Sequence, residues 1–149
     1  MPRRKGSDLP APSSEPAHDI GGVLERSLYV VAESGQDLTP IFFRRFFALH
    51  PDQEHLFPKS SEACGEMVNE ILENLLALAS DESWVQLSID NQVSAHRCYG
   101  NFSLPLYRDV LDVFVRTLED LAGERWSAEF DAAWRQMTDK FYALIAKAH

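Results

Sequence analysis

The stretch "SEACGEMVNEILENLLALAS" (residues 61–80) constrains the fold more than any other part of the chain. Its apolar residues come in pairs that repeat every four positions: Met67 with Val68, Ile71 with Leu72, and Leu75 with Leu76. A four-residue repeat places these side chains on one face of an α-helix, whereas the side chains of a half-buried strand alternate every second residue. The sequence therefore predicts a long amphipathic helix that packs one face against a core.

Helices are also predicted on both sides of this segment, because capping residues and helix breakers divide the chain into periodic stretches. We expect helices over residues 20–34, 39–50, 51–57, 61–80, 81–100, 103–122 and 127–147. The expected N-caps are Thr39, Ser103 and Ser127, and the expected helix-ending glycines are Gly35, Gly100 and Gly123.

The apolar spacing also predicts which side chains face inward. In the stretch over 81–100 the expected inward residues are Trp84, Leu87, Val93 and His96. In the last helix they are Phe130, Trp134, Met137, Phe141 and Ile145. No alternating strand pattern appears in the sequence. The expected fold is therefore all-α, with about seven helices around one core.

The length of 149 residues fits a single domain, and a hydrophobic fraction of 45% is enough for a core without disulfides. We expect residues 1–18, which are basic and then rich in Pro and Ser, to be a disordered tail. Residues 19–149 are then the domain. Because the tail has no apolar segment typical of a signal peptide and no run is long enough to span a membrane, we expect a cytoplasmic protein.

Charge and cysteine content exclude several classes of partner. A net charge of −9 argues against binding to nucleic acid, whose phosphates repel an acidic surface. Cys64 and Cys98 are too few for a disulfide framework or a tetrahedral metal site. We expect both to be free thiols in a reducing compartment.

One histidine, His96 in "SAHRCYGNF" (residues 94–102), shares a helical face with Ile89 and Val93. Burying an imidazole without a partner is costly, so His96 needs either a hydrogen bond or a metal. The spacing alone favours the hydrogen bond. No second ligand stands at metal-binding spacing, so the metal alternative requires a cofactor that brings its own ligands and takes one imidazole from the protein.

Several landmarks in order resemble the globin family, especially the bacterial single-domain haem globins, over residues 20–147. They are "LTPIFFRRFFALHPDQEHLFP", the long amphipathic helix, "HRCYG" and "ERWSAEFDAAWRQMTDKFYALI". The resemblance implies a globin fold around haem b (iron protoporphyrin IX), with His96 as the proximal iron ligand. The haem contacts that it implies are Phe43, Phe57, Met67, Ile71, Phe102, Tyr107 and Val110.

The function implied by the resemblance is reversible binding of a diatomic gas (dioxygen, carbon monoxide or nitric oxide) at ferrous iron. Where the family usually has a distal histidine or glutamine, this chain has Met67, so the expected distal side of Phe43, Met67 and Ile71 is apolar. We expect the second ring nitrogen of His96 to donate to a backbone carbonyl near Gln92.

Three alternatives remain open. Met67 as a sixth iron ligand would suit an electron-transfer or sensor globin. A haem enzyme would be a nitric-oxide dioxygenase, a nitrite reductase or a weak peroxidase. The peroxidase reading is weakened because related bacterial globins use a glutamate late in the last helix, and we expect none before His149. The third alternative is a haem-free interaction module. Whether a redox partner or a second copy binds stays open.

Overall fold

The computed structural model describes residues 19–97 and 102–149, and all regular elements in these two ranges are helical. The all-α prediction is therefore confirmed. The predicted tail over 1–18, Cys98 and Gly100 lie outside the described residues. The elements are α1 (Ile20–Ala32), α2 (Leu38–Leu49), the 3-10 helix η3 (Pro51–Leu56), α3 (Ser61–Ala79), α4 (Val85–Arg97), α5 (Leu104–Ala122), the 3-10 helix η4 (Gly123–Arg125) and α6 (Ala128–Ala148).

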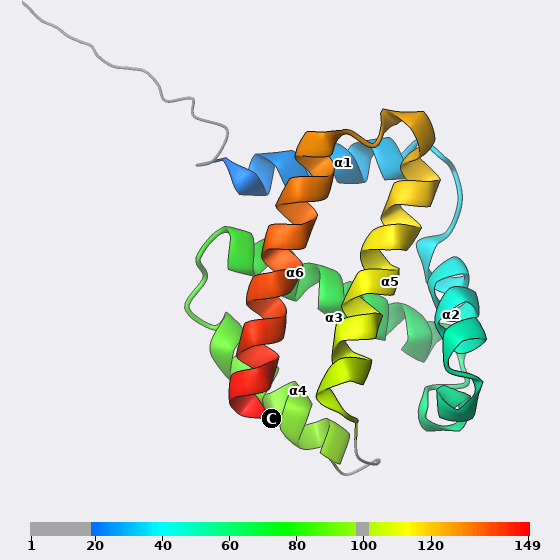
Figure 1. The fold of residues 1–149 in the computed structure, drawn as a ribbon, viewed down its shortest axis with the longest axis vertical. Coiled ribbons are helices and arrows are strands. Elements are labelled where there is room, and N and C mark those ends of the chain that lie inside the picture. Colours follow the sequence, from blue (N-terminus) through cyan, green and yellow to red (C-terminus); the bar gives the residue numbers. More distant parts are fainter. Residues whose placement is uncertain (1–18, 98–101) are drawn as a thin grey trace, which may run out of the picture.

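The helices pack in crossed layers around one core. Figure 1 shows α5 and α6 side by side, with α3 crossing behind them and α1 lying across one end. The C-terminal end of α6 lies beside α4, and α2 packs against α5. No helix in the described ranges is long and apolar enough to cross a membrane.

Most of the predicted helix boundaries follow from local capping. The Ser103 hydroxyl accepts the backbone N–H of Leu106, and the Ser127 hydroxyl accepts that of Phe130. Gly123 ends α5 with a φ of 63°, a left-handed conformation that favours glycine. One predicted cap is wrong: α2 begins at Leu38 with Asp37 as its N-cap.

The reason for the Asp37 cap is its backbone conformation. Its φ of −81° and ψ of 120° are those of an extended N-cap residue, and its carboxylate accepts the backbone N–H of Thr39. Thr39 itself lies inside the helix, so its own hydroxyl does not serve as the cap.

The inward face of α6 is as predicted, since all five expected residues are buried. The predicted face of α4 is wrong in part. Val85, Ile89 and Val93 form the buried row, whereas the side chains of Trp84 and Leu87 are 48% and 64% exposed. Trp84 precedes the first helical residue, so helical periodicity does not govern its direction. Leu87 lies half a turn away from the buried row at Val85 and Ile89.

Candidate cofactor pocket

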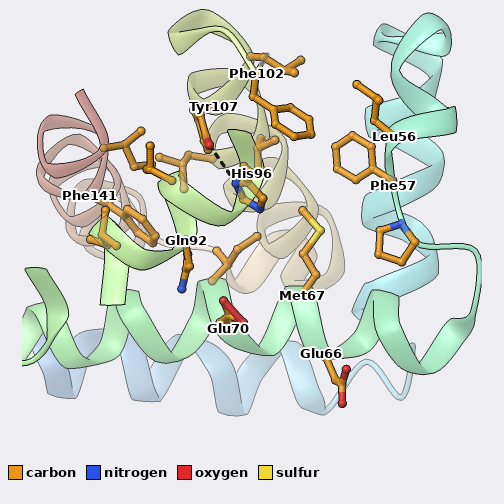
Figure 2. Close-up of a pocket in the computed structure, with 18 of the residues that line it drawn as sticks. Leu56, Phe57, Glu66, Met67, Glu70, Gln92, His96, Phe102, Tyr107 and Phe141 are labelled. Carbon is orange, nitrogen blue, oxygen red and sulfur yellow. Dashed lines mark hydrogen bonds between the residues drawn. The ribbon is translucent and has the colours of Figure 1, made fainter. Parts of the chain in front are cut away.

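A cavity of about 560 Å³ lies between α3 and α4 and reaches the start of α5, as Figure 2 shows. Its walls are mostly apolar, and the far end is closed by Phe141 and Ile145 of α6. Protein sites for small organic molecules and cofactors have this size and composition, with a few polar groups that orient the ligand. The polar lining residues are Glu66, Glu70, Gln92, His96 and Tyr107.

His96 enters the cavity from the last turn of α4, one turn after Val93 and Gln92. Its Nδ1 atom lies 2.9 Å from the hydroxyl oxygen of Tyr107 on α5. Burial lowers the pKa of the His96 imidazole, because the charged form loses its water. The ring is therefore neutral at neutral pH, and a neutral imidazole nitrogen is a metal ligand.

The predicted partner of His96 is wrong. We expected the second nitrogen to donate to a backbone carbonyl near Gln92, but the Tyr107 hydroxyl takes that place. The carbonyl of Gln92 lies inside α4, where the helical pattern directs it to the N–H of the residue four positions later. The ring of His96 turns away from its own helix towards α5, and there the phenol is within reach.

The Nε2 atom of His96 has no hydrogen-bond partner among residues 19–97 and 102–149. In Figure 2 the ring lies between Tyr107 and Met67, with this second nitrogen on the side of Met67. When Nδ1–H donates to the oxygen of Tyr107, Nε2 keeps its lone pair for a ligand in the cavity. This tautomer, in which Nδ1–H donates to the Tyr107 oxygen, is the one that can bind a metal through Nε2.

Aromatic rings form the wall next to His96. The ring of Phe102 lies 5.2 Å from the His96 ring and 5.9 Å from that of Phe57 (centroid distances). Phe57 follows the short helix η3, which turns its ring back towards α2. Phe43 packs behind it, with 6.0 Å between the two centroids, and is itself outside the cavity lining.

Seven of the eight residues implied by the globin resemblance thus lie around one cavity. These are Phe57, Met67, Ile71, His96, Phe102, Tyr107 and Val110. The eighth, Phe43, does not line the cavity but packs against Phe57, which does.

Sequence reasoning missed three polar residues of the lining, Glu66, Glu70 and Gln92. The sequence spacing could have predicted two of them, because residues three and four positions apart lie on the same helix face. Glu70 follows Met67 by three positions, and Gln92 precedes His96 by four. His149 was also missed: its Nε2 lies 2.8 Å from the carbonyl oxygen of Phe102, and its ring packs on Tyr107.

Other ionisable groups lie outside the cavity. His50 lies 2.9 Å from Asp109, and His55 is exposed. Cys64 is a free thiol that donates to the carbonyl of Pro58, and burial raises its pKa. In the part of the chain that the structure describes, no three His, Cys, Asp or Glu side chains are placed to hold a bare metal ion.

No family model matches the chain, and no curated protein matches it significantly.

Proposed function

We propose that this chain is a single-domain haem globin that reversibly binds a diatomic gas at ferrous iron. The observation that carries the proposal is His96, whose neutral ring presents Nε2, unpaired among the described residues, to a mostly apolar cavity of about 560 Å³. The helical packing supports a globin-like fold. The two walls of the cavity come from α3 and α4, and α5 and α6 close it.

The lining fits a flat, largely apolar cofactor. Ile71 and Val110 offer aliphatic surface, and Phe57 and Phe102 offer ring faces or edges. One imidazole is the only protein ligand that a tetrapyrrole iron requires, because the macrocycle supplies four. The haem would supply the iron that holds the gas.

The residues of the cavity would hold the cofactor, orient its ligand and surround the bound gas. His96 holds the cofactor on one side. Tyr107 orients the imidazole by accepting a hydrogen bond from Nδ1–H, and this bond also makes Nε2 a more basic ligand for a metal. Met67 and Ile71 face the opposite side of the cavity without offering a hydrogen-bond donor to the gas. Phe57, with the buried rings of Phe43 and Phe46 packed behind it, offers the cofactor an apolar wall.

A second candidate function follows from the position of Met67. Its side chain extends from α3 towards the side of the cavity where His96 lies in Figure 2, with the thioether sulfur in its outer part. A histidine and a methionine on opposite sides of a haem form the ligand pair of many electron-transfer proteins. In that case Met67 would close the gas site, and the protein would transfer electrons or act as a sensor.

The test compares two histidine variants. His96→Ala and the matched control His55→Ala are expressed, supplied with hemin, and measured by Soret absorbance per protein chain. His55 is exposed and outside the cavity lining. We expect one haem per chain in the wild type and in His55→Ala, and loss of stoichiometric haem in His96→Ala.

A His96→Gly variant adds a rescue arm, because free imidazole is expected to occupy the vacated space and to restore a histidine-like spectrum. The same haem content and ferrous spectrum in His96→Ala as in the wild type would exclude His96 as the ligand. A wild-type protein that contains no haem and takes up no hemin would support the haem-free interaction module.

A further inference from the structure

Glu70 of α3 and Gln92 of α4 lie where the cavity borders a groove on the protein surface. Both line the cavity, and both also line an outer groove that continues along α4 past Trp84 and Leu87. Figure 2 shows Glu70 on α3 between Met67 and Gln92, below the ring of His96. A molecule that passes from the groove into the cavity therefore passes the Glu70 carboxylate.

The charges around this passage have one sign. Glu70 is exposed, and Glu66 lies one turn before it on α3, also at the cavity. Among the described residues, neither the cavity nor the outer groove is lined by a lysine or an arginine. Figure 2 shows the carboxylate of Glu66 directed away from His96, so Glu70 is the closer charge on the path.

We infer that Glu70 makes this passage selective for uncharged ligands and against anions. Water partly screens the exposed Glu70 carboxylate, but an anion inside the apolar cavity is screened less than one in bulk water, so the carboxylate repels it. An anion that enters must also give up hydration that no lysine or arginine among the described lining residues replaces. A neutral ligand meets neither cost.

The inference deepens the proposed function by naming the ligand class. Dioxygen, carbon monoxide and nitric oxide are neutral, whereas nitrite, azide and cyanide ion are anions. If the cavity holds haem, as proposed, Glu70 therefore favours the binding of a neutral gas and opposes nitrite reduction. The charge argument itself concerns the cavity of the chain and holds with or without haem.

The first test uses the haem-free protein, so that its result does not depend on the proposed function. Two fluorescent probes share one ring system: N-phenyl-1-naphthylamine is neutral, and 8-anilinonaphthalene-1-sulfonate carries a sulfonate. Their dissociation constants are measured for the wild type, Glu70→Gln and Glu70→Lys at low and high salt. The control variants are Glu25→Gln and Glu25→Lys. They make the same charge changes at an exposed position of α1 that lines neither the cavity nor the outer groove.

We expect Glu70→Gln to strengthen sulfonate binding by about three- to tenfold at low salt, and Glu70→Lys to strengthen it further. Binding of the neutral amine should stay within about twofold, and high salt should reduce the differences, since mobile ions screen exposed charges. Equal changes for both probes would indicate altered packing and would overturn the inference. An effect at Glu70 no larger than that at Glu25 would do the same.

The second test rests on the proposed function and uses the haem-loaded protein. Association rates are measured for azide with the ferric form and for carbon monoxide with the ferrous form. Glu70→Lys should raise the association rate of azide and leave that of carbon monoxide unchanged. Equal effects on the two ligands would contradict the inferred selectivity against anions. Failure to bind haem would overturn the proposed function alone, because the probe experiment would still decide the role of Glu70.

Discussion

The Nδ1 atom of His96 lies 2.9 Å from the hydroxyl oxygen of Tyr107 and joins the end of α4 to the start of α5. The two residues stand eleven positions apart in the sequence, one in α4 and the other in α5. Because the bond occupies Nδ1, only Nε2 is directed to the cavity. The orientation of the candidate iron ligand thus depends on a residue of another helix.

Tyr107→Phe tests this dependence. The variant keeps the ring but removes the hydroxyl, so the haem-free protein should lose about 0.5–1.5 kcal/mol of unfolding free energy in urea. Hemin affinity should fall by about 10- to 100-fold, the usual cost of losing the partner of a metal-binding histidine. The iron–histidine stretching frequency of the ferrous protein should shift as well. An unchanged frequency and an unchanged affinity would show that Tyr107 does not orient His96.

Two substitutions at Met67 distinguish the open pocket from the six-coordinate haem. Met67→Gln adds a hydrogen-bond donor, and Met67→Leu keeps the volume while removing the sulfur. In an open pocket, Met67→Gln should raise dioxygen affinity by about tenfold to a hundredfold and carbon monoxide affinity by less, since dioxygen gains more negative charge on binding. Met67→Leu should then resemble the wild type.

If Met67 instead ligates the iron, the wild type should be low-spin without added ligand, and both Met67 variants should lose that spectrum. The measurements are absorption spectra of the oxidised and reduced proteins and gas titrations. A result in which neither substitution changes the spectrum or the gas affinities would show that Met67 does not face the haem.

The stability of the haem-free protein should depend on pH through His96. Its pKa is lowered by burial, so the unfolded chain binds more protons than the folded one in the window below the ordinary histidine value of about 6.5. The stabilising contribution is complete above that value and is lost as the pH falls towards the folded pKa. The slope from one group is at most about 1.4 kcal/mol per pH unit.

Urea unfolding between pH 5 and pH 7.5 measures this slope. His96→Leu should flatten it, and the control His55→Leu should not, because His55 is exposed. A wild-type slope that survives in His96→Leu would assign the dependence to other groups.

Ser27 and Trp134 join α1 to α6 by a buried hydrogen bond. The indole N–H donates to the Ser27 oxygen at 2.7 Å, and the Ser27 hydroxyl donates to the carbonyl of Leu24. Ser27→Ala should cost about 1–3 kcal/mol of unfolding free energy, because the indole N–H is left buried without an acceptor. In a Trp134→Phe background the same substitution should cost less, and equal costs in both backgrounds would contradict this explanation.

A truncated chain that begins at Asp19 should keep the haem spectrum and the melting temperature of the full chain. Residues 1–18 are rich in Pro, Ser and charged residues and show no apolar periodicity, which is typical of a segment without a core of its own. Differential scanning calorimetry and an absorption spectrum of both proteins provide the comparison. A melting temperature lower by several degrees would show that residues 1–18 contribute to the domain.

Helix boundaries could be predicted where their causes are local. Ser103, Ser127 and Gly123 act on backbone groups within three or four positions, so their roles are visible in the sequence. The cap of α2 was assigned two positions too late, because Asp37 and Thr39 are both good cap residues. Only the backbone conformation at Asp37 distinguishes them.

The sequence by itself determined that this chain forms amphipathic helices and that His96 shares a face with Ile89 and Val93, because the helical repeat is a local property. The tertiary structure decided which neighbours these faces meet. It buried Val85 in place of Trp84, gave His96 the hydroxyl of Tyr107, and brought Glu70 and Gln92 together at the passage into the cavity. Such contacts depend on the distances and angles at which helices pack, and these are set by the fit of many side chains from distant parts of the chain.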